Sequence, residues 1–196
     1  MKTTTSRFLV TVLVSLAVLL SMIAAASPVF AQAAHIRWDI ISIASVATGA
    51  PGGIASAFAN NGSQITITGS GTFVAPAGGD GTSSATTGGG TFKIHTADGT
   101  LRASGTYTVT GLVRWEEKGT FPTPPFPPNT VGGLAVLRVE FSDGSHGVLT
   151  VSCHSVNDSS PAIFEGITVT KDFVAFWNRQ APVAGVDANR TQFHVE

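Results

Sequence analysis

Residues that could bind a metal ion or hydrolyse a bond are few in this chain, and their spacing fits neither task. The five histidines form no H-x-H or H-E-x-x-H motif, the spacings that place two side chains on one metal. Cys153 and His154 are adjacent, so on a strand they point to opposite faces. Asp143, Ser145 and His146 crowd the residue types of a hydrolase triad into one turn, whereas triad members converge from separate elements. The sequence therefore predicts no metal site, no cofactor and no catalytic triad.

Acid–base chemistry has a better set of candidates on two polar strand faces. Arg114 alternates with Glu116, and Arg138 alternates with Glu140, on two predicted strands. If these strands pair antiparallel on the outside of the fold, which the apolar opposite faces favour, opposite charges could face each other as exposed ion pairs. If the same face lined the inside of a barrel, Arg114, Arg138 and Glu140 with Tyr107 would be the acid and base groups of a cofactor-free isomerase or cyclase.

Two long segments are candidates for ligand or partner loops. Residues 69–90 are rich in Gly, Ser, Thr and Ala, and residues 118–131 contain five prolines, which predict an extended excursion outside the sheet centre. Phe121 and Phe126 lie within the proline-rich segment. They are either hydrophobic pegs that hold the loop over one end of the domain, or part of a lid or recognition loop.

The elements that position these residues are predicted to be short antiparallel strands. Helical periodicity is absent after the first 33 residues, whereas apolar residues alternate over short stretches that Gly, Asn, Asp and Pro interrupt. Asn61-Gly62, Asp98-Gly99 and residues 142–147 each lie between two such stretches and predict hairpins. The pattern indicates an all-β fold of roughly ten strands, a single antiparallel meander that forms a β-barrel or, alternatively, a two-sheet β-sandwich.

Strand parity also predicts which large side chains are buried. Trp115 shares its face with Val113, and Trp177 shares its face with Phe173, so both tryptophans are expected in the core. The single cysteine, Cys153, alternates with apolar residues and is expected to be an inert core thiol rather than a partner in a disulfide between chains. Exposed tryptophans would instead indicate a carbohydrate-binding or partner-binding surface.

The first 33 residues have the three parts of a secretory signal. Lys2 and Arg7 form the positive start, residues 8–26 are almost uninterruptedly apolar, and Ala31-Gln32-Ala33 is an A-x-A cleavage site. We expect cleavage after Ala33, in preference to an uncleaved anchor, which leaves residues 34–196 as a single β domain. The domain is then secreted, extracellular or periplasmic.

Net charge excludes several classes of partner. The chain has 11 Lys and Arg against 12 Asp and Glu, and the predicted signal removes two basic residues and no acidic one. The remaining basic residues are scattered, so the sequence predicts no nucleic-acid partner. No integral membrane domain is expected after signal cleavage.

The size and strand pattern resemble those of small secreted barrels such as the lipocalins, or the allene oxide cyclase and dirigent group. This resemblance is one of architecture, and it carries no functional residue onto this sequence. The pattern favours a non-catalytic β-scaffold that binds a small apolar ligand, or an extracellular partner, through its long loops. The alternative is the isomerase or cyclase described above.

Overall fold

The structure is a computed structural model that describes residues 33–42, 51–76, 81–155, 163–180 and 189–196. The predicted signal peptide therefore lies outside the described residues, apart from Ala33. The described part of the chain is all-β and contains no helix, as predicted. Within it, no helix is long and apolar enough to cross a membrane.

Twelve strands form one continuous antiparallel sheet. They are β1 (Ala34–Ile40), β2 (Ala55–Phe58), β3 (Gln64–Ile67), β4 (Ser70–Ala75), β5 (Thr86–His95), β6 (Leu101–Thr120), β7 (Thr130–Phe141), β8 (His146–Cys153), β9 (Gly166–Lys171), β10 (Val174–Phe176), β11 (Asn178–Arg179) and β12 (Thr191–Val195).

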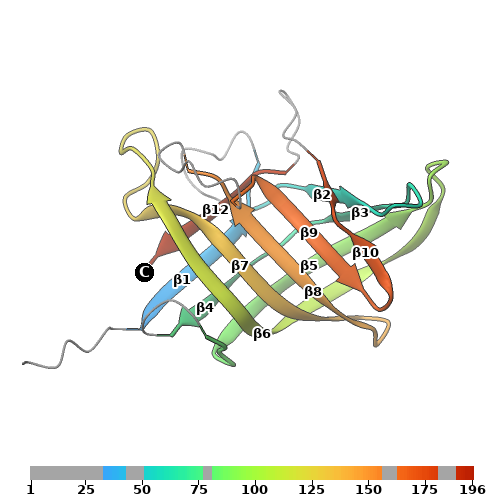
Figure 1. Ribbon diagram of the computed structural model, residues 1–196, viewed down its shortest axis with the longest axis horizontal. Coiled ribbons are helices and arrows are strands. Elements are labelled where there is room, and N and C mark those ends of the chain that lie inside the picture. Colours follow the sequence, from blue (N-terminus) through green and yellow to red (C-terminus); the bar gives the residue numbers. More distant parts are fainter. Residues whose placement is uncertain (1–32, 43–50, 77–80, 156–162, 181–188) are drawn as a thin grey trace, which may run out of the picture. The chain divides into compact units, whose positions relative to one another are not determined.

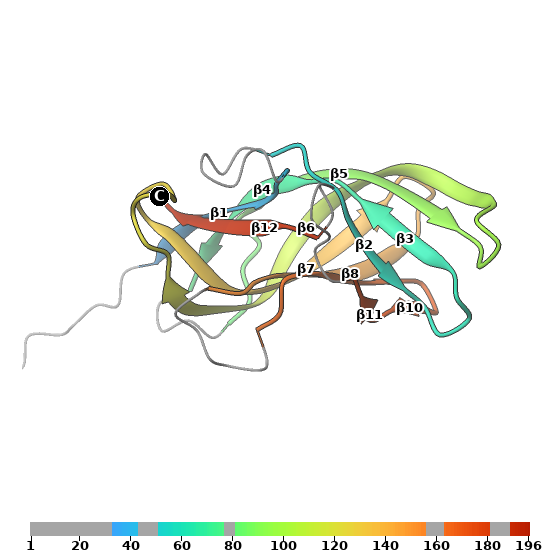
Figure 2. The same cartoon turned by 90° about the horizontal axis from the view of Figure 1, so that it is seen from above.

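Six of these strands close into a barrel-like ring (Figures 1 and 2). The ring runs from β5 to β6, β7, β12, β1 and β4, and β4 pairs with β5 again. The shortest ladder of the ring joins β7 to β12. There Val131 pairs with Phe193, and Thr130 pairs with His194. The long strand β6 makes the ring possible, because its first part pairs with β5 and its remainder pairs with β7.

The other strands extend the sheet from both sides of this ring. β8, β9 and β10 continue from β7, whereas β3, β2 and β11 continue from β5. At Trp177 the chain passes from β10, in the extension from β7, to β11, in the extension from β5. The two extensions are in contact, because β2 lies against β9. The fold thus joins a ring to a sandwich-like half, and both architectures expected from the sequence contribute to it.

The three predicted hairpins are confirmed. β2 pairs with β3 across Asn61-Gly62, β5 pairs with β6 across Asp98-Gly99, and β7 pairs with β8 across residues 142–145. Gly62 has φ +80° and Gly99 has φ +86°, a region that glycine reaches without steric cost. Turn chemistry therefore sets the register of these strands.

Half of the glycine-rich segment 69–90 is strand, as residues 70–75 belong to β4 and residues 86–90 to β5, which corrects the prediction of a loop over its whole length. Ser70 pairs with Gly89 and Gly71 pairs with Gly88 in the ladder between β4 and β5. Close packing explains the glycines, because a Cβ on Gly69 would lie 2.1 Å from the Tyr107 hydroxyl. The residues that looked flexible are instead those that let strands and core side chains approach closely.

Aromatic side chains fill both halves of the core. Trp115 lies with its ring centroid 4.7 Å from Phe193 and 5.3 Å from Phe73, which closes the ring interior. In the other half, the Phe141 ring lies 5.1 Å from Phe92. The expected burial of Trp115 is confirmed, since it is only 3% exposed. Trp38 and the Cys153 thiol are also buried, the latter as predicted.

The prediction that Trp177 belongs to the core is wrong. Trp177 is 67% exposed, and Phe173, on the same strand face, is fully exposed at the turn between β9 and β10. Strand parity was read correctly, but the inward face of β10 is the one that carries Phe176, which is buried. Alternation alone does not say which of two apolar faces meets the core, and here both faces are apolar.

Candidate functional site

The four acid–base candidates do not converge on one site. Arg114, Arg138 and Glu140 are exposed on the outer face of β6 and β7, whereas Tyr107 is buried on the inner face of β6. Arg114 Nη2 lies 2.8 Å from Glu116 Oε2 along its own strand, and bulges in β6 set Arg138 opposite Gly111. The expected outside position of these charges is therefore observed, but the pairing runs along β6 rather than across the two strands.

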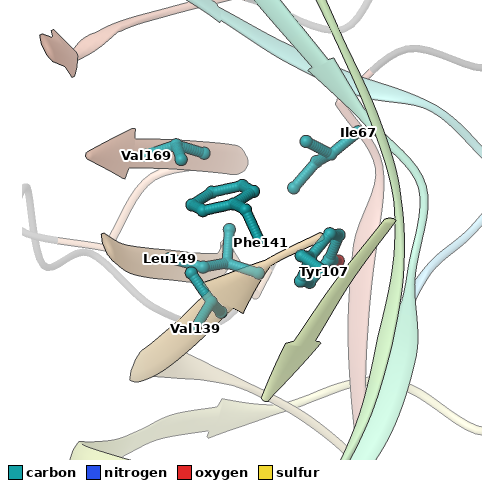
Figure 3. A pocket seen from close by; sticks show the side chains of 6 residues that line it. All are labelled: Ile67, Tyr107, Val139, Phe141, Leu149 and Val169. Atoms are coloured by element: carbon teal, nitrogen blue, oxygen red, sulfur yellow. The ribbon is translucent and has the colours of Figure 1, made fainter. Parts of the chain in front are cut away.

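Tyr107 donates a hydrogen bond of 2.9 Å to the carbonyl oxygen of Thr68. Burial raises the pKa of its phenol far above the usual value, so the hydroxyl is a structural donor at neutral pH. Figure 3 shows its ring beside the hollow that Phe141 and four aliphatic side chains line. The hollow has no room for a water molecule. This part of the core is packed, and it is not a chamber for an apolar cargo.

A cavity lies at the tips of three hairpins, and we call it the hairpin-tip pocket. It has a volume of about 250 Å³, about the space of eight water molecules. Its walls come from the turns β2–β3, β5–β6 and β9–β10, whose tips gather at the same end of the sheet (Figure 1). The lining side chains are Asn61, Ser63, Ile94, Arg102, Ala103, Lys171, Asp172, Phe173, Val174 and Phe176.

Charged side chains of both signs lie at the hairpin-tip pocket. The Lys171 side chain is only 10% exposed, and its Nζ lies 2.6 Å from Asp143 Oδ2 and 4.0 Å from Asp172 Oδ2. The hydrogen bond from Lys171 holds the pKa of the Asp143 carboxyl well below its usual range. Arg102 adds a second, exposed cation. The lining itself holds two cations, Arg102 and Lys171, and one carboxylate, Asp172, while Asp143 pairs with Lys171 from outside the lining.

Two exposed aromatic side chains flank β10, which borders the hairpin-tip pocket. Phe173, in the turn before β10, lines the pocket, and Trp177 directly follows β10. Beside Trp177, the side-chain amide of Asn178 donates a 3.1 Å hydrogen bond to Asn60. Large exposed aromatic side chains next to amide groups form a surface that is apolar and also able to hydrogen-bond.

A second, smaller cavity lies beneath the proline-rich loop, and we call it the loop pocket. It has a volume of about 120 Å³. The loop brings Phe121 and Phe126 together with ring centroids 4.6 Å apart, and both rings line the cavity. Phe121 also packs against the main core, as expected of a side chain that holds the loop over the end of the domain. The rings of Phe121 and Phe126 together form one wall of the pocket. The remaining lining residues are Ile41, Cys153, His154, Glu165, Arg190, Thr191 and Gln192.

The loop pocket holds one strongly perturbed acid that the sequence did not indicate. Glu165 precedes β9, and its carboxylate accepts hydrogen bonds from the backbone N–H of Thr191 at 2.8 Å and of His154 at 3.1 Å. Burial raises the pKa of Glu165 to about 7, against the lowering effect of these bonds and of Arg190. Glu165 therefore bridges the end of β8 to the start of β12, where no strand ladder joins them.

Glu165 and Arg190 lie outside every motif, which is why sequence reasoning missed them. Glu165 stands beside Gly166 and Arg190 beside Asn189, at strand starts that are distant in sequence. Among the residues with described positions, no group of three or more His, Cys, Asp or Glu side chains is arranged to hold a metal ion.

No protein-family model, no curated protein and no solved structure matches this chain.

Proposed function

We propose that the chain is an exported, non-catalytic β-scaffold that binds neutral carbohydrate at the hairpin-tip pocket. The observation that carries the proposal is the exposure of Phe173, which lines a cavity with polar walls, and of Trp177, which directly follows the pocket-lining residue Phe176. Export rests on the secretory signal predicted in the first 33 residues.

Large aromatic side chains exposed close together mark a surface that a partner can cover. The apolar face of a sugar ring stacks on such rings, because its C–H groups meet the negative face of the π-system. Phe173 and Trp177 flank the three-residue strand β10, so their Cα atoms are at most about 13 Å apart. Two stacking positions at that distance suit an oligosaccharide chain rather than a single sugar.

The polar walls fit hydroxyl groups rather than a charged ligand. Asn61 Oδ1 already accepts from the backbone N–H and the hydroxyl of Ser63, which orients its amide at the rim. Lys171 and Asp172 provide a donor and an acceptor whose charges offset each other. A neutral ligand with many hydroxyls meets these groups without leaving a charge uncompensated.

Calorimetric titration of the purified protein tests the proposal with cellohexaose, xylohexaose, mannohexaose and chitohexaose. We expect at least one hexasaccharide to bind, and Phe173→Ala and Trp177→Ala each to weaken that binding by about tenfold or more. Ile54→Ala is the matched control, since Ile54 is also an exposed apolar residue but does not line the pocket. Binding that both aromatic variants keep would contradict the proposal, as would binding of heparin or oligogalacturonate alone.

A further inference from the structure

The loop pocket, which shares no lining residue with the hairpin-tip pocket, contains a cation with one unused hydrogen-bond donor. Arg190 lines the cavity, and its Nε is buried without a hydrogen-bond partner in the described part of the chain. A buried donor on a charged group that lacks an acceptor costs free energy, more than a neutral donor does. The guanidinium is therefore prepared for an acceptor that enters from the cavity.

Glu165 is the carboxylate that lines the same cavity, but its oxygens already accept other hydrogen bonds. One of its oxygens accepts from Thr191 N–H and the other from His154 N–H. Within the described residues, no hydrogen bond or ion pair joins Glu165 to Arg190, although the cation influences the acid electrostatically. The two charges thus share the pocket without neutralising each other in a direct contact.

We propose that the loop pocket is a second ligand site, which binds a small monocarboxylate through Arg190 and packs its apolar group against the wall that Phe121 and Phe126 form. A guanidinium receives a carboxylate through two parallel N–H···O bonds, the strongest arrangement available to it. The aromatic pair, with Ile41, supplies the apolar wall. This site is independent of the carbohydrate proposal, because the two cavities share no lining residue.

The volume selects the size of the acid. About 120 Å³ is the space of roughly four water molecules. Typical pockets for larger organic ligands hold about 300–1,000 Å³. A fatty acid or a cofactor therefore does not fit, whereas an acid with one compact apolar group does.

Protonation of the pocket supports the choice of an anion. The titratable and charged groups around Glu165 in the described chain are Cys153 and His154 at the end of β8 and Arg190 before β12. Burial raises the pKa of Cys153 well above its usual value, so the thiol is neutral. Burial also raises the pKa of Glu165 to about 7, so this acid carries less negative charge below neutral pH. An incoming carboxylate then meets Arg190 with less repulsion.

The test compares acids with their uncharged amides on the full wild-type protein. We expect benzoate and propionate to bind in a protein-observed NMR titration, and benzamide and propionamide to bind at least tenfold more weakly. The affinity for benzoate should rise as the pH falls from 8 to 6, because Glu165 becomes neutral. Equal binding of acids and amides would overturn the proposal without any variant being needed.

Variants then assign the binding to the pocket. Arg190→Gln should lose benzoate binding at least tenfold, Arg190→Lys should retain part of it, and Phe126→Ala should weaken benzoate more than acetate. Trp177→Ala is the control and should bind benzoate as the wild type does. Retention of full affinity by an Arg190→Gln protein with a wild-type unfolding midpoint would refute the assignment, as would loss of binding in the Trp177→Ala control.

Discussion

Replacing each of two tryptophans by alanine should have very unequal consequences for stability. Trp115 is 3% exposed and packs against Phe193 and Phe73, with ring centroids 4.7 and 5.3 Å away. Truncating a buried tryptophan typically costs about 3–5 kcal/mol. Each aromatic pair adds about 0.5–1.5 kcal/mol beyond its buried area, which places Trp115→Ala near the upper end of that range. Trp177 is 67% exposed, so Trp177→Ala should cost less than about 1 kcal/mol.

Urea unfolding followed by far-ultraviolet circular dichroism measures both changes, because this signal does not depend on the tryptophans being replaced. A domain of this size has a total stability of about 5–15 kcal/mol, and a denaturant slope near 2 kcal/mol per M is typical in urea. A loss of about 4 kcal/mol then lowers the midpoint by about 2 M for Trp115→Ala. The reasoning is refuted if Trp115→Ala unfolds near the wild-type midpoint, or if Trp177→Ala loses as much stability as Trp115→Ala.

Three further changes test the core and the loop pocket. Because burial raises the pKa of Glu165 to about 7 from an ordinary value near 4.5, the native carboxyl holds its proton more tightly than the unfolded one. Wild type should therefore lose up to about 3 kcal/mol relative to Glu165→Gln as pH rises from 4.5 to 8; urea unfolding at both pH values checks this, and a constant difference would contradict it. Asn189→Ala removes the 2.6 Å hydrogen bond that the buried Ser56 N–H donates to Asn189 Oδ1, and should lower the unfolding free energy by about 1–3 kcal/mol, with no effect counting against it. Gly69→Ala drives a Cβ against the Tyr107 hydroxyl and should cost about 1–3 kcal/mol, part of which Tyr107→Phe restores in the double variant; additive losses would contradict the clash.

Most of the fold could be predicted from local sequence signals. Asn61-Gly62 and Asp98-Gly99 are turns because both residues of each pair tolerate the backbone conformation that a tight hairpin needs. The alternation of apolar and polar residues then predicted which side chains of the neighbouring strands face the core. Closure of the ring was beyond such reasoning, since the pairing of β12 with β1 joins residues from opposite ends of the chain.

Segments with unusual composition were harder to interpret. The glycine-rich segment 69–90 lacks the side chains that mark a strand, yet its glycines are required by close contacts such as that of Gly69 with Tyr107. Trp177 was assigned to the core because Phe173 and Ala175 share its face, but the opposite face of β10 is also apolar and holds Phe176. Only the position of β10 at the end of the sheet decides between them.

The sequence indicated some residues of the loop pocket, but it did not indicate the hairpin-tip pocket. Phe121 and Phe126 were selected as loop residues, and the structure places both in the wall of the loop pocket. Glu165 and Arg190 gave no signal, because a buried acid or base outside a motif looks like any charged residue near a turn. The hairpin-tip pocket arises from three turns that are adjacent only in the folded chain.

Quenching of tryptophan fluorescence by acrylamide tests the carbohydrate proposal most directly. Of the three tryptophans, Trp38 and Trp115 are buried, so Trp177 supplies the quenchable signal. The account predicts that at least one of the four hexasaccharides lowers the quenching constant saturably, and that Phe173→Ala, which leaves Trp177 in place, weakens this protection by about tenfold or more. Unchanged quenching with all four hexasaccharides, or full protection in the Phe173→Ala protein, would contradict carbohydrate binding at the hairpin-tip pocket.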